Sequence, residues 1–404
     1  MAGRTSPVPI ITSAVVSAAV FLWVFIAVEG RRSPAVRPPR TDPPIPFVDY
    51  HADVAHDEDL LSRSTAAALR WIERHQDADG SWSASSYTQE CVEKVCPGRG
   101  GEGNDVGLTA LVVVSILESG QPRTYEDSIR RALAWLSARQ DELGTFGPRS
   151  PKAGYAQALA TLAFARAVGI LGDDSFRPAA QRGARALEMA RNPGFGWRYG
   201  PRDGQNDSSV TEWAGAALLA AAAPGVGLPV DPAAMDGIRR WLSEVTGDRG
   251  EVWYMRREIS SSSVRGLGDR FEQSEGLSAG ALWLRLEMGE DRRRPELALL
   301  AKRLVWNLPV WTPEGASVDY HAWFWGTRAL EAWGDRELWG IWSTRVLKVV
   351  ALHQRRYNEG CLWGSWDPVD RWAFEGGRVY ATSMNLLTLG VLERGRTRDR
   401  EGKR

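Results

Sequence analysis

The chain has 404 residues, and its 50 basic residues balance 50 acidic ones, so the formal net charge is zero. A balanced charge provides no field of one sign that would recruit nucleic acid, so we expect no nucleic-acid partner. Three cysteines are too few for a disulfide scaffold in a chain of this length.

The first apolar stretch covers residues 10–28, after a short N-terminal tail at 1–9. It is long enough to cross a bilayer as a helix, and Trp23 stands near one end. A cleaved signal peptide is the alternative, but its apolar core would be shorter and would end at a small-residue cleavage site. This stretch ends in Glu-Gly-Arg-Arg. We therefore predict a single-pass membrane anchor.

The sequence leaves the side of the membrane open. Four arginines follow the span soon after it ends, whereas only Arg4 precedes it. Positive charges favour the cytoplasmic side, which would place the large part of the chain in the cytoplasm. Cys91 and Cys96 lie close together, which favours an oxidising compartment instead. Both orientations stay open at this point.

Residues 29–59 are rich in proline and poor in apolar side chains. This composition is typical of an extended, semi-rigid spacer. Histidine and aspartate alternate within 51–59, but a spacer supplies no rigid geometry for a metal ion. We interpret the whole segment as a solvated linker.

One motif recurs along the rest of the chain, where an amphipathic helix pattern runs into a turn that contains glycine and an aromatic residue. The clear copies are Gln76–Trp82, Gln140–Phe146 and Gln354–Trp366, and weaker copies occur at Arg191–Trp197 and Thr246–Trp253. A recurrence of roughly 50 to 60 residues indicates a repeat protein.

Two helix types alternate between these turns. The first is amphipathic, as expected of a helix with one face in water; the segments are 64–76, 125–140, 178–191, 232–245, 295–305 and 342–354. The second is apolar nearly all round, as expected of an enclosed helix; the segments are 105–119, 155–171, 207–223, 274–288, 319–333 and 379–394.

Six amphipathic helices that each cover one apolar helix leave no inner face exposed if the array closes on itself. No stretch shows the sustained alternation of a strand. The sequence therefore predicts an all-α fold, an α6/α6 toroid over residues 60–395 with six inner and six outer helices. A charged tail follows at 396–404.

The cysteines allow two interpretations. Cys91 and Cys96 share a glycine-rich loop, 83–104, where they either form a local disulfide or stay as two reduced thiols. Cys361 lies inside a turn of the recurring motif and has no obvious disulfide partner, so we expect it to serve packing.

The recurring turns resemble the QW motif of the prenyltransferase and squalene-oxidase repeat, which occurs in triterpene cyclases and in protein prenyltransferase β subunits. The resemblance covers about residues 60–395. The segments 105–111, 207–213 and 377–384 are similar to those of bacterial membrane-linked proteins of this repeat class with no settled activity. The resemblance implies the toroid fold, while activity requires the catalytic motifs themselves.

The resemblance to squalene-hopene-type cyclases implies an Asp-x-Asp-Asp acid at the start of an inner helix, and the sequence contains none. Asp105, Asp207 and Asp319 stand at such starts, where a lone carboxylate usually caps the helix. We expect caps, and a non-standard catalytic acid among the three is the alternative.

The segment Asp319–Trp323 resembles the zinc helix of protein prenyltransferases, which implies a further Asp-x-Cys on an earlier inner helix. The corresponding segment, 270–274, has no thiol, so two of the three protein ligands are missing. We therefore expect no metal ligands and no cofactor. His321 is then a hydrogen-bonded residue of the core or of a pocket.

A ring of inner helices leaves a central cavity, and we expect polar and aromatic residues near the helix starts to line it. They are Asp207, Trp213, Tyr320, His321, Trp323, Trp325, Tyr380 and Thr382. Aromatic walls of this kind bind apolar chains well. The alternative is that the rings fill the centre, because Trp323, Phe324 and Trp325 share one helix turn and cannot all face inward.

Two functions are compatible with this pattern. The first is a membrane-anchored binding or scaffolding module for a polyisoprenoid-like lipid or a protein partner. The second is a terpene-cyclase-like or prenyltransferase-like enzyme that uses a non-standard acid. The missing acid motif and the incomplete zinc triad favour the first, and no catalytic residue is assigned.

Overall fold

The computed structural model describes residues 58–401 apart from 92–94, 149–152, 257–273 and 313–316. The chain divides into two units, Met1–Ile45 and Pro46–Arg404, and all the described residues belong to the second. The predicted anchor at 10–28 and nearly all of the predicted linker lie outside the described residues.

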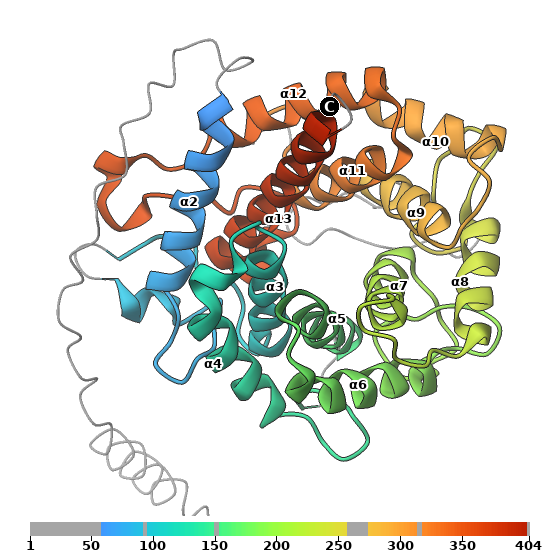
Figure 1. The fold of residues 1–404 in the computed structure, drawn as a ribbon, viewed down its shortest axis with the longest axis horizontal. Helices are drawn as coiled ribbons and strands as arrows, with labels where there is room; N and C mark the ends of the chain where they lie inside the picture. The colour runs from blue at the N-terminus through green and yellow to red at the C-terminus, as the bar shows by residue number, and fades with distance from the viewer. Residues whose placement is uncertain (1–57, 92–94, 149–152, 257–273, 313–316, 402–404) are drawn as a thin grey trace, which may run out of the picture. The chain divides into compact units, whose positions relative to one another are not determined.

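Within this unit the helices form two concentric rings, as predicted (Figure 1). The outer helices are α2 (Glu58–Arg74), α4 (Glu126–Ser137), α6 (Arg177–Ala190), α8 (Pro232–Val245), α10 (Pro295–Trp306) and α12 (Arg336–Leu352). The inner helices are α3 (Asp105–Leu117), α5 (Ala153–Leu171), α7 (Ser208–Ala222), α9 (Glu275–Glu287), α11 (Tyr320–Trp333) and α13 (Ala373–Glu401).

Short 3-10 helices precede some of these elements: η1 (Tyr87–Glu90), η2 (Pro122–Tyr125), η3 (Asp174–Phe176) and η5 (Tyr357–Leu362). The described ranges hold no β-strand, only two isolated bridges that close turns of the recurring motif. The predicted all-α fold is therefore confirmed for the part of the chain that the structure describes.

The two helix types follow from which faces they bury. On α4, Ile129, Leu133 and Leu136 are fully buried while Glu126 and Arg130 pair on the outer side. On α3, every residue from Leu108 to Leu117 is buried, because neighbouring helices enclose it. A one-sided apolar stripe suits a ring's outer layer, and an apolar helix suits its inner layer.

Among the described helices, α5 alone is long and apolar enough to cross a membrane by length and composition. It is mostly buried and contacts α3, α6 and α7. Its apolar character therefore serves the core of the ring.

The ring closes through the glutamines of the recurring turns. The Gln76 side chain donates to the Ser128 carbonyl oxygen at 2.9 Å and so ties the first turn to the next outer helix. Gln354 repeats this bond at the other end of the chain, donating to the Ser64 carbonyl oxygen at 2.9 Å. Ser64 belongs to α2, and α2 lies beside α12 and α13 (Figure 1). The last repeat is therefore bonded to the first.

A buried ion cluster joins four of the inner helices, α3, α5, α11 and α13. Glu118, at the end of α3, lies 3.1 Å from Arg328 of α11, 3.0 Å from Arg166 of α5 and 3.5 Å from Arg394 of α13. Burial alone would raise the pKa of Glu118, but the three guanidinium groups hold it at about 2. The cluster lies at the carboxyl-terminal end of α3 and links this helix to three other inner helices.

Helix limits differ from the predicted ones mainly near the chain ends. α2 begins six residues earlier than predicted, and α12 begins at Arg336. α13 begins at Ala373 and bends at Gly377, whose φ of 58° favours glycine. The helix also continues to Glu401, so much of the predicted charged tail is helical.

Candidate functional site

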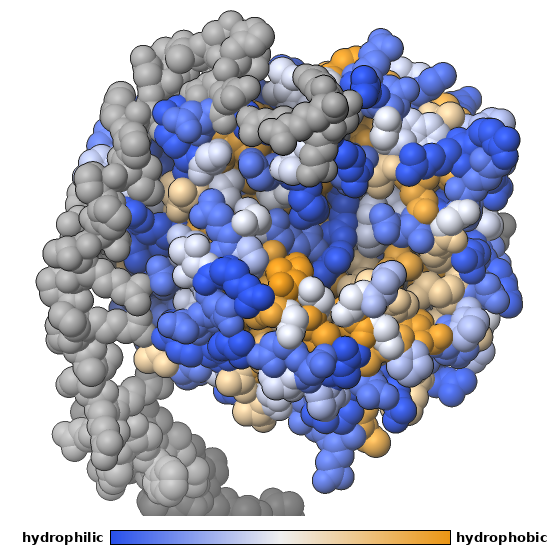
Figure 2. Space-filling model, viewed as in Figure 1, coloured by the Kyte–Doolittle hydropathy of each residue, from blue (hydrophilic) through white to orange (hydrophobic). Residues whose placement is uncertain are grey.

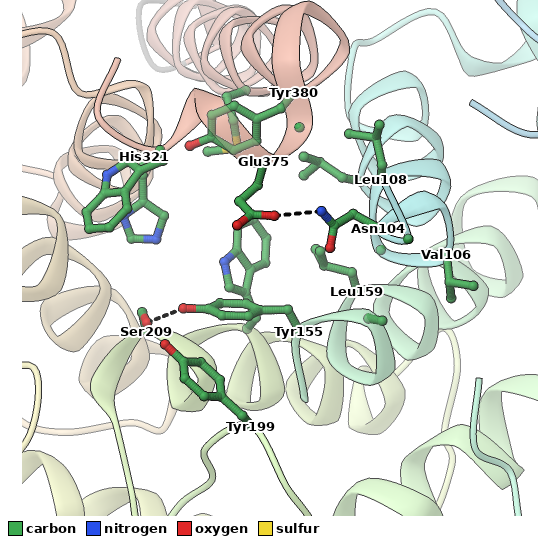
Figure 3. A pocket seen from close by; sticks show the side chains of 18 of the residues that line it. Asn104, Val106, Leu108, Tyr155, Leu159, Tyr199, Ser209, His321, Glu375 and Tyr380 are labelled. Carbon is green, nitrogen blue, oxygen red and sulfur yellow. Dashed lines mark hydrogen bonds between the residues drawn. The ribbon is translucent and has the colours of Figure 1, made fainter. Parts of the chain in front are cut away.

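A cavity of about 530 Å³ lies between the amino-terminal turns of the six inner helices. Each helix supplies part of the wall; one contributor from each is Leu108, Tyr155, Ser209, Leu277, His321 and Tyr380, and Figure 3 shows most of them around the cavity. The helix starts meet here because the ring places all six inner helices side by side. The volume lies within the usual range of small-molecule sites.

Most of the wall is apolar. Leu108, Leu159, Leu277 and Met384 line it together with the indole of Trp213. Among the described lining residues, Glu375 is the one charged side chain, and none is lysine or arginine. Figure 2 shows apolar residues gathering toward the middle of one face of the ring, with hydrophilic residues mostly around them. The described part of the wall therefore offers no lysine or arginine for a phosphate group to pair with.

Asn104 and Glu375 are bonded to each other in the wall. The Asn104 amide donates to Glu375 Oε2 at 2.7 Å, a bond between the start of α3 and the start of α13 (Figure 3). Phe374, beside Glu375, also lines the cavity and is 43 % exposed. An apolar side chain that is this exposed at the wall marks a place where the cavity meets the surface.

A hydrogen-bond network forms the polar side of the cavity. Ser209 Oγ donates to Asp207 Oδ1 at 3.0 Å, and Tyr254 donates its hydroxyl to Asp207 Oδ2 at 3.3 Å. The Tyr155 hydroxyl is 2.5 Å from Ser209 Oγ (Figure 3), and the Tyr199 hydroxyl is 2.6 Å from that of Tyr254. Ser209 and Tyr254 both give their hydroxyl protons to Asp207. Tyr155 therefore donates its proton to Ser209, and Tyr199 donates its proton to Tyr254.

Asp207 is the centre of this network and the cap of α7. It is fully buried, and its Oδ1 accepts the Val210 backbone N–H at 2.7 Å. Burial raises the pKa of Asp207 to about 6, against the lowering effect of its hydrogen bonds and of Arg198. The carboxyl group therefore changes protonation state close to neutral pH.

A second buried acid, Glu212, faces His321. The Glu212 side chain is fully buried, and its Oε2 lies 3.7 Å from His321 Nε2. Burial raises the pKa of Glu212 well above its usual range and lowers that of His321 to about 4. His321 Nε2 accepts the indole N–H of Trp325 at 3.0 Å, so the imidazole proton resides on Nδ1. His321 is therefore neutral at pH 7, and burial favours the protonated form of Glu212.

The structure separates the predicted pocket residues into two groups. Trp213, His321 and Tyr380 line the cavity. Asp207 lies behind the wall and acts through Ser209 and Tyr254, which do line it.

The other four predicted residues are buried between helices, a correction to their expected place in the wall. Tyr320 donates its hydroxyl to the Asp367 carbonyl oxygen at 2.7 Å, and Trp323 packs edge-on against its ring. Trp325 packs between neighbouring rings, and Thr382 is buried beside the turn of Trp366. The aromatic cluster of α11 thus fills space between helices, while the centre of the ring keeps its cavity.

Of the three aspartates expected to cap helices, two do so. Asp207 accepts from Val210 as described, and Asp319 accepts the Ala322 backbone N–H at 2.9 Å. Asp105 is instead the first residue of α3, after Asn104.

Sequence reasoning missed the tyrosines of the network. Tyr199 and Tyr254 closely follow Trp197 and Trp253, the aromatic residues of two recurring turns. The backbone at both turns is bonded to the start of α7, because the Asp207 N–H donates to the Trp197 carbonyl oxygen and the Ser208 N–H to the Tyr254 carbonyl oxygen, each at 2.9 Å. A polar residue at this place in the repeat therefore lies close to the cap of α7. This position in the repeat is the signal that could have found them.

The three cysteines have free thiols and gather around one histidine, away from the cavity. Cys91 and Cys96 therefore form no disulfide with each other. Their sulfur atoms each lie 3.7 Å from His75 Nε2, and Cys361 Sγ lies 3.3 Å from the same nitrogen. Cys361 is buried, as a packing role requires, and also contacts this histidine.

No protein-family model matches the chain, and no curated protein matches it. Solved structures do resemble it. A variant of the type II terpene cyclase MstE from Scytonema, in complex with merosterolic acid A, has a TM-score of 0.54 at 16% identity, covering 83% of this chain and 97% of its own. The α-1,6-mannanase GH76A of Salegentibacter has a TM-score of 0.57 at 10% identity, covering 82% of this chain and 99% of its own.

An α-amylase from Clostridium perfringens is also similar, with a TM-score of 0.52 at 12% identity, covering 81% of this chain and 97% of that one. Proteins with such different substrates share this architecture. The likeness therefore shows the fold, and any activity has to be inferred from the site itself. The chain has the α/α-toroid fold that terpene cyclases also have.

Proposed function

We propose that the toroid binds a neutral, largely apolar lipid of isoprenoid type in its central cavity. The observation that supports this most directly is the composition of the wall, which is leucine and aromatic with no lysine or arginine among the described lining residues. A diphosphate or carboxylate head would be buried there without a cation, at a large cost in free energy. A hydrocarbon or an alcohol carries no charge, so its burial there does not have this cost.

The hydroxyl network gives such a lipid one polar contact point. Tyr155 and Tyr199 donate their protons inward, which leaves oxygen lone pairs available as acceptors at the cavity surface. A ligand hydroxyl can donate to either oxygen. The expected ligand is therefore an isoprenoid alcohol oriented with its hydroxyl toward Tyr155.

The anchor predicted at residues 10–28 belongs to the same proposal. A lipid of this kind resides in a bilayer, and a tethered toroid samples the bilayer surface continuously. The protein would then act as a membrane-anchored module that holds the lipid, or that presents it to a protein partner.

The experiment is native mass spectrometry of the full chain in detergent, incubated with geranylgeraniol, squalene or geranylgeranyl diphosphate. The proposal predicts adducts with the alcohol and the hydrocarbon, and much less with the diphosphate. Ala156, which lines the cavity, is replaced in an Ala156→Phe variant that should lose the adducts. The matched control is Met189→Phe on the exposed face of α6, which should keep them. Preferential binding of the diphosphate would refute the proposal.

One observation favours a second function, acid-catalysed rearrangement of the bound lipid. Asp207 has a pKa of about 6 and is linked through Ser209 to the Tyr155 hydroxyl at the cavity surface. When Asp207 is protonated the directions of these hydrogen bonds reverse, so that Asp207 donates to Ser209, Ser209 to Tyr155 and Tyr155 to a bound alkene. The proton that the alkene takes from Tyr155 is then replaced through Ser209 from Asp207, which is left as the carboxylate. Extraction of products after incubation with squalene or geranylgeraniol tests this, and loss of product in Asp207→Asn would support it.

A further inference from the structure

Four metal-ligating side chains from distant parts of the sequence meet at one point outside the cavity. His75 follows α2, Cys91 and Cys96 lie in the loop before α3, and Cys361 lies in η5 of the last repeat. Their ligand atoms all lie within 4.8 Å of one another. His75 and Cys96 are almost completely buried, and Cys361 is only 6 % exposed.

The spacing matches a tetrahedral zinc ion. Zn–S bonds of about 2.3 Å and Zn–N bonds of about 2.0 Å place the sulfur and nitrogen ligand atoms about 3.5 Å apart in tetrahedral geometry. His75 Nε2 lies 3.3 Å from Cys361 Sγ and 3.7 Å from each of the Cys91 and Cys96 sulfur atoms. The atoms need only small shifts to coordinate one ion.

The surroundings of His75 already orient its ring as a metal site requires. Its Nδ1 donates to the Trp71 carbonyl oxygen at 2.8 Å, and the Trp71 ring stacks on the imidazole with centroids 4.1 Å apart. This bond places the ring proton on Nδ1 and turns the Nε2 lone pair toward the three sulfur atoms. A histidine that binds metal through one nitrogen typically donates from the other in this way.

The thiols are supported as well. The Cys96 backbone N–H donates to Cys91 Sγ at 3.3 Å, and Arg74 Nη2 lies 3.7 Å from Cys361 Sγ. Three thiolates, a neutral imidazole and Zn²⁺ carry a net charge of minus one, which the Arg74 guanidinium offsets. Soft sulfur ligands exclude magnesium and calcium.

We propose that His75, Cys91, Cys96 and Cys361 bind one Zn²⁺ as a structural Cys₃His site that fastens the last repeat to the first. Binding releases the three thiol protons to solvent, and no oxidation is involved. The protein supplies all four ligands, so no position stays open for water or substrate, as in structural zinc sites. None of the four residues lines the cavity, so the site and the ligand proposal stand independently.

The first test uses the full wild-type chain, purified without chelators under reducing conditions. Elemental analysis should find one equivalent of zinc per chain, and a mercurial thiol reagent should release it stoichiometrically, followed with a chromogenic chelator. Replacement by Co²⁺ should give visible bands typical of tetrahedral coordination and a near-ultraviolet thiolate charge-transfer band. These measurements need no variant, so they do not depend on how a variant folds.

The second test compares two histidines in equivalent places of the repeat. His353 also donates from Nδ1 to a backbone carbonyl oxygen four residues earlier, Val349 at 2.8 Å, and stacks on Trp311 with centroids 3.9 Å apart. His75→Ala and the isosteric Cys361→Ser should lose the zinc and lower the melting temperature, whereas His353→Ala should keep the zinc.

Three outcomes would overturn the proposal. These are a wild-type chain without zinc after expression in zinc-supplemented medium, a Cys91–Cys96 disulfide found by mass spectrometry, and iron with acid-labile sulfide in place of zinc. Retention of a full zinc equivalent in Cys361→Ser would also count against the four-ligand site.

Discussion

Glu118 offers a direct measure of how much the buried ion cluster stabilises the ring. The Glu118→Gln substitution keeps the size of the side chain and removes its charge. Arg328, which is buried against it, would then keep a guanidinium without a counter-charge. Removing one partner of a buried ion pair typically costs about 3–5 kcal/mol.

The pKa of Glu118 gives a second route to the same magnitude. The shift from 4.5 to about 2 corresponds to roughly 3 kcal/mol of stabilisation at neutral pH, at about 1.4 kcal/mol per pH unit. Burial lowers the pKa of Arg328 to about 10, so its charged form is disfavoured while that of Glu118 is favoured. We use the pKa shift of Glu118 to judge the net attraction. Its carboxylate faces three guanidinium groups, whereas the three guanidinium groups have to share that single carboxylate.

The sign of the pH dependence follows from the depressed pKa. The contribution of Glu118 is fully present above its unfolded pKa of 4.5 and is lost as pH falls through about 2. The free energy of unfolding, from urea titration followed by tryptophan fluorescence, should be about 3–5 kcal/mol lower in the variant at pH 7. The difference should shrink below pH 4.

Glu126→Gln is the matched control, because Glu126 pairs with Arg123 and Arg130 at the surface. Its effect should be small, since exposed ion pairs contribute little. A Glu118→Gln variant as stable as the wild type at pH 7 would refute the reasoning, and so would a difference that does not change with pH.

Four further substitutions have defined outcomes. Asp207→Asn removes a buried acid whose pKa of about 6 disfavours the folded state above that pH. The variant should gain up to about 3 kcal/mol relative to wild type between pH 4 and 7, as measured by urea titration. Gly364→Ala places a Cβ 2.1 Å from the Ala67 carbonyl oxygen at a φ of +92° and should cost more than about 2 kcal/mol. Gly340→Ala in the open part of α12 should instead stabilise by about 0.5–1 kcal/mol. Tyr155→Phe should weaken geranylgeraniol binding by about 1 kcal/mol and leave squalene binding unchanged, by calorimetric titration.

The fold could be predicted because its determinants are local. Each outer helix shows its one-sided apolar stripe within a dozen residues, and each turn shows its own glycine and aromatic residue. The closing bond from Gln354 to Ser64 follows once the copies are aligned, because Gln76 makes the same bond to the next outer helix. Repetition thus converts local patterns into a global architecture.

The site was predicted less completely, because it depends on which way each inner helix is rotated. The sequence of α11 places Trp323, Phe324 and Trp325 in one turn, and no local rule says which ring faces the cavity. The structure turns His321 to the wall and the tryptophans into the packing.

The cysteine cluster was missed for a different reason. Cys361 lies 270 positions after Cys91 in the chain, so nothing in the local sequence connects them. Cys91 and Cys96 are close in sequence only to each other. His75 stands directly before the repeat glutamine Gln76, where nothing in the local pattern indicates a metal ligand. Ring closure brings the first and last repeats together, and only this contact assembles the group.

The bond between Gln354 and Ser64 also bears on how the molecule comes apart. A linear stack of repeats frays from its outermost units, which have a neighbour on one side only. In a closed circle every helix pair has two neighbours, so no unit is weaker by position. Such a body should melt as a whole, and deleting its final pair would uncover α2 rather than simply shorten the array.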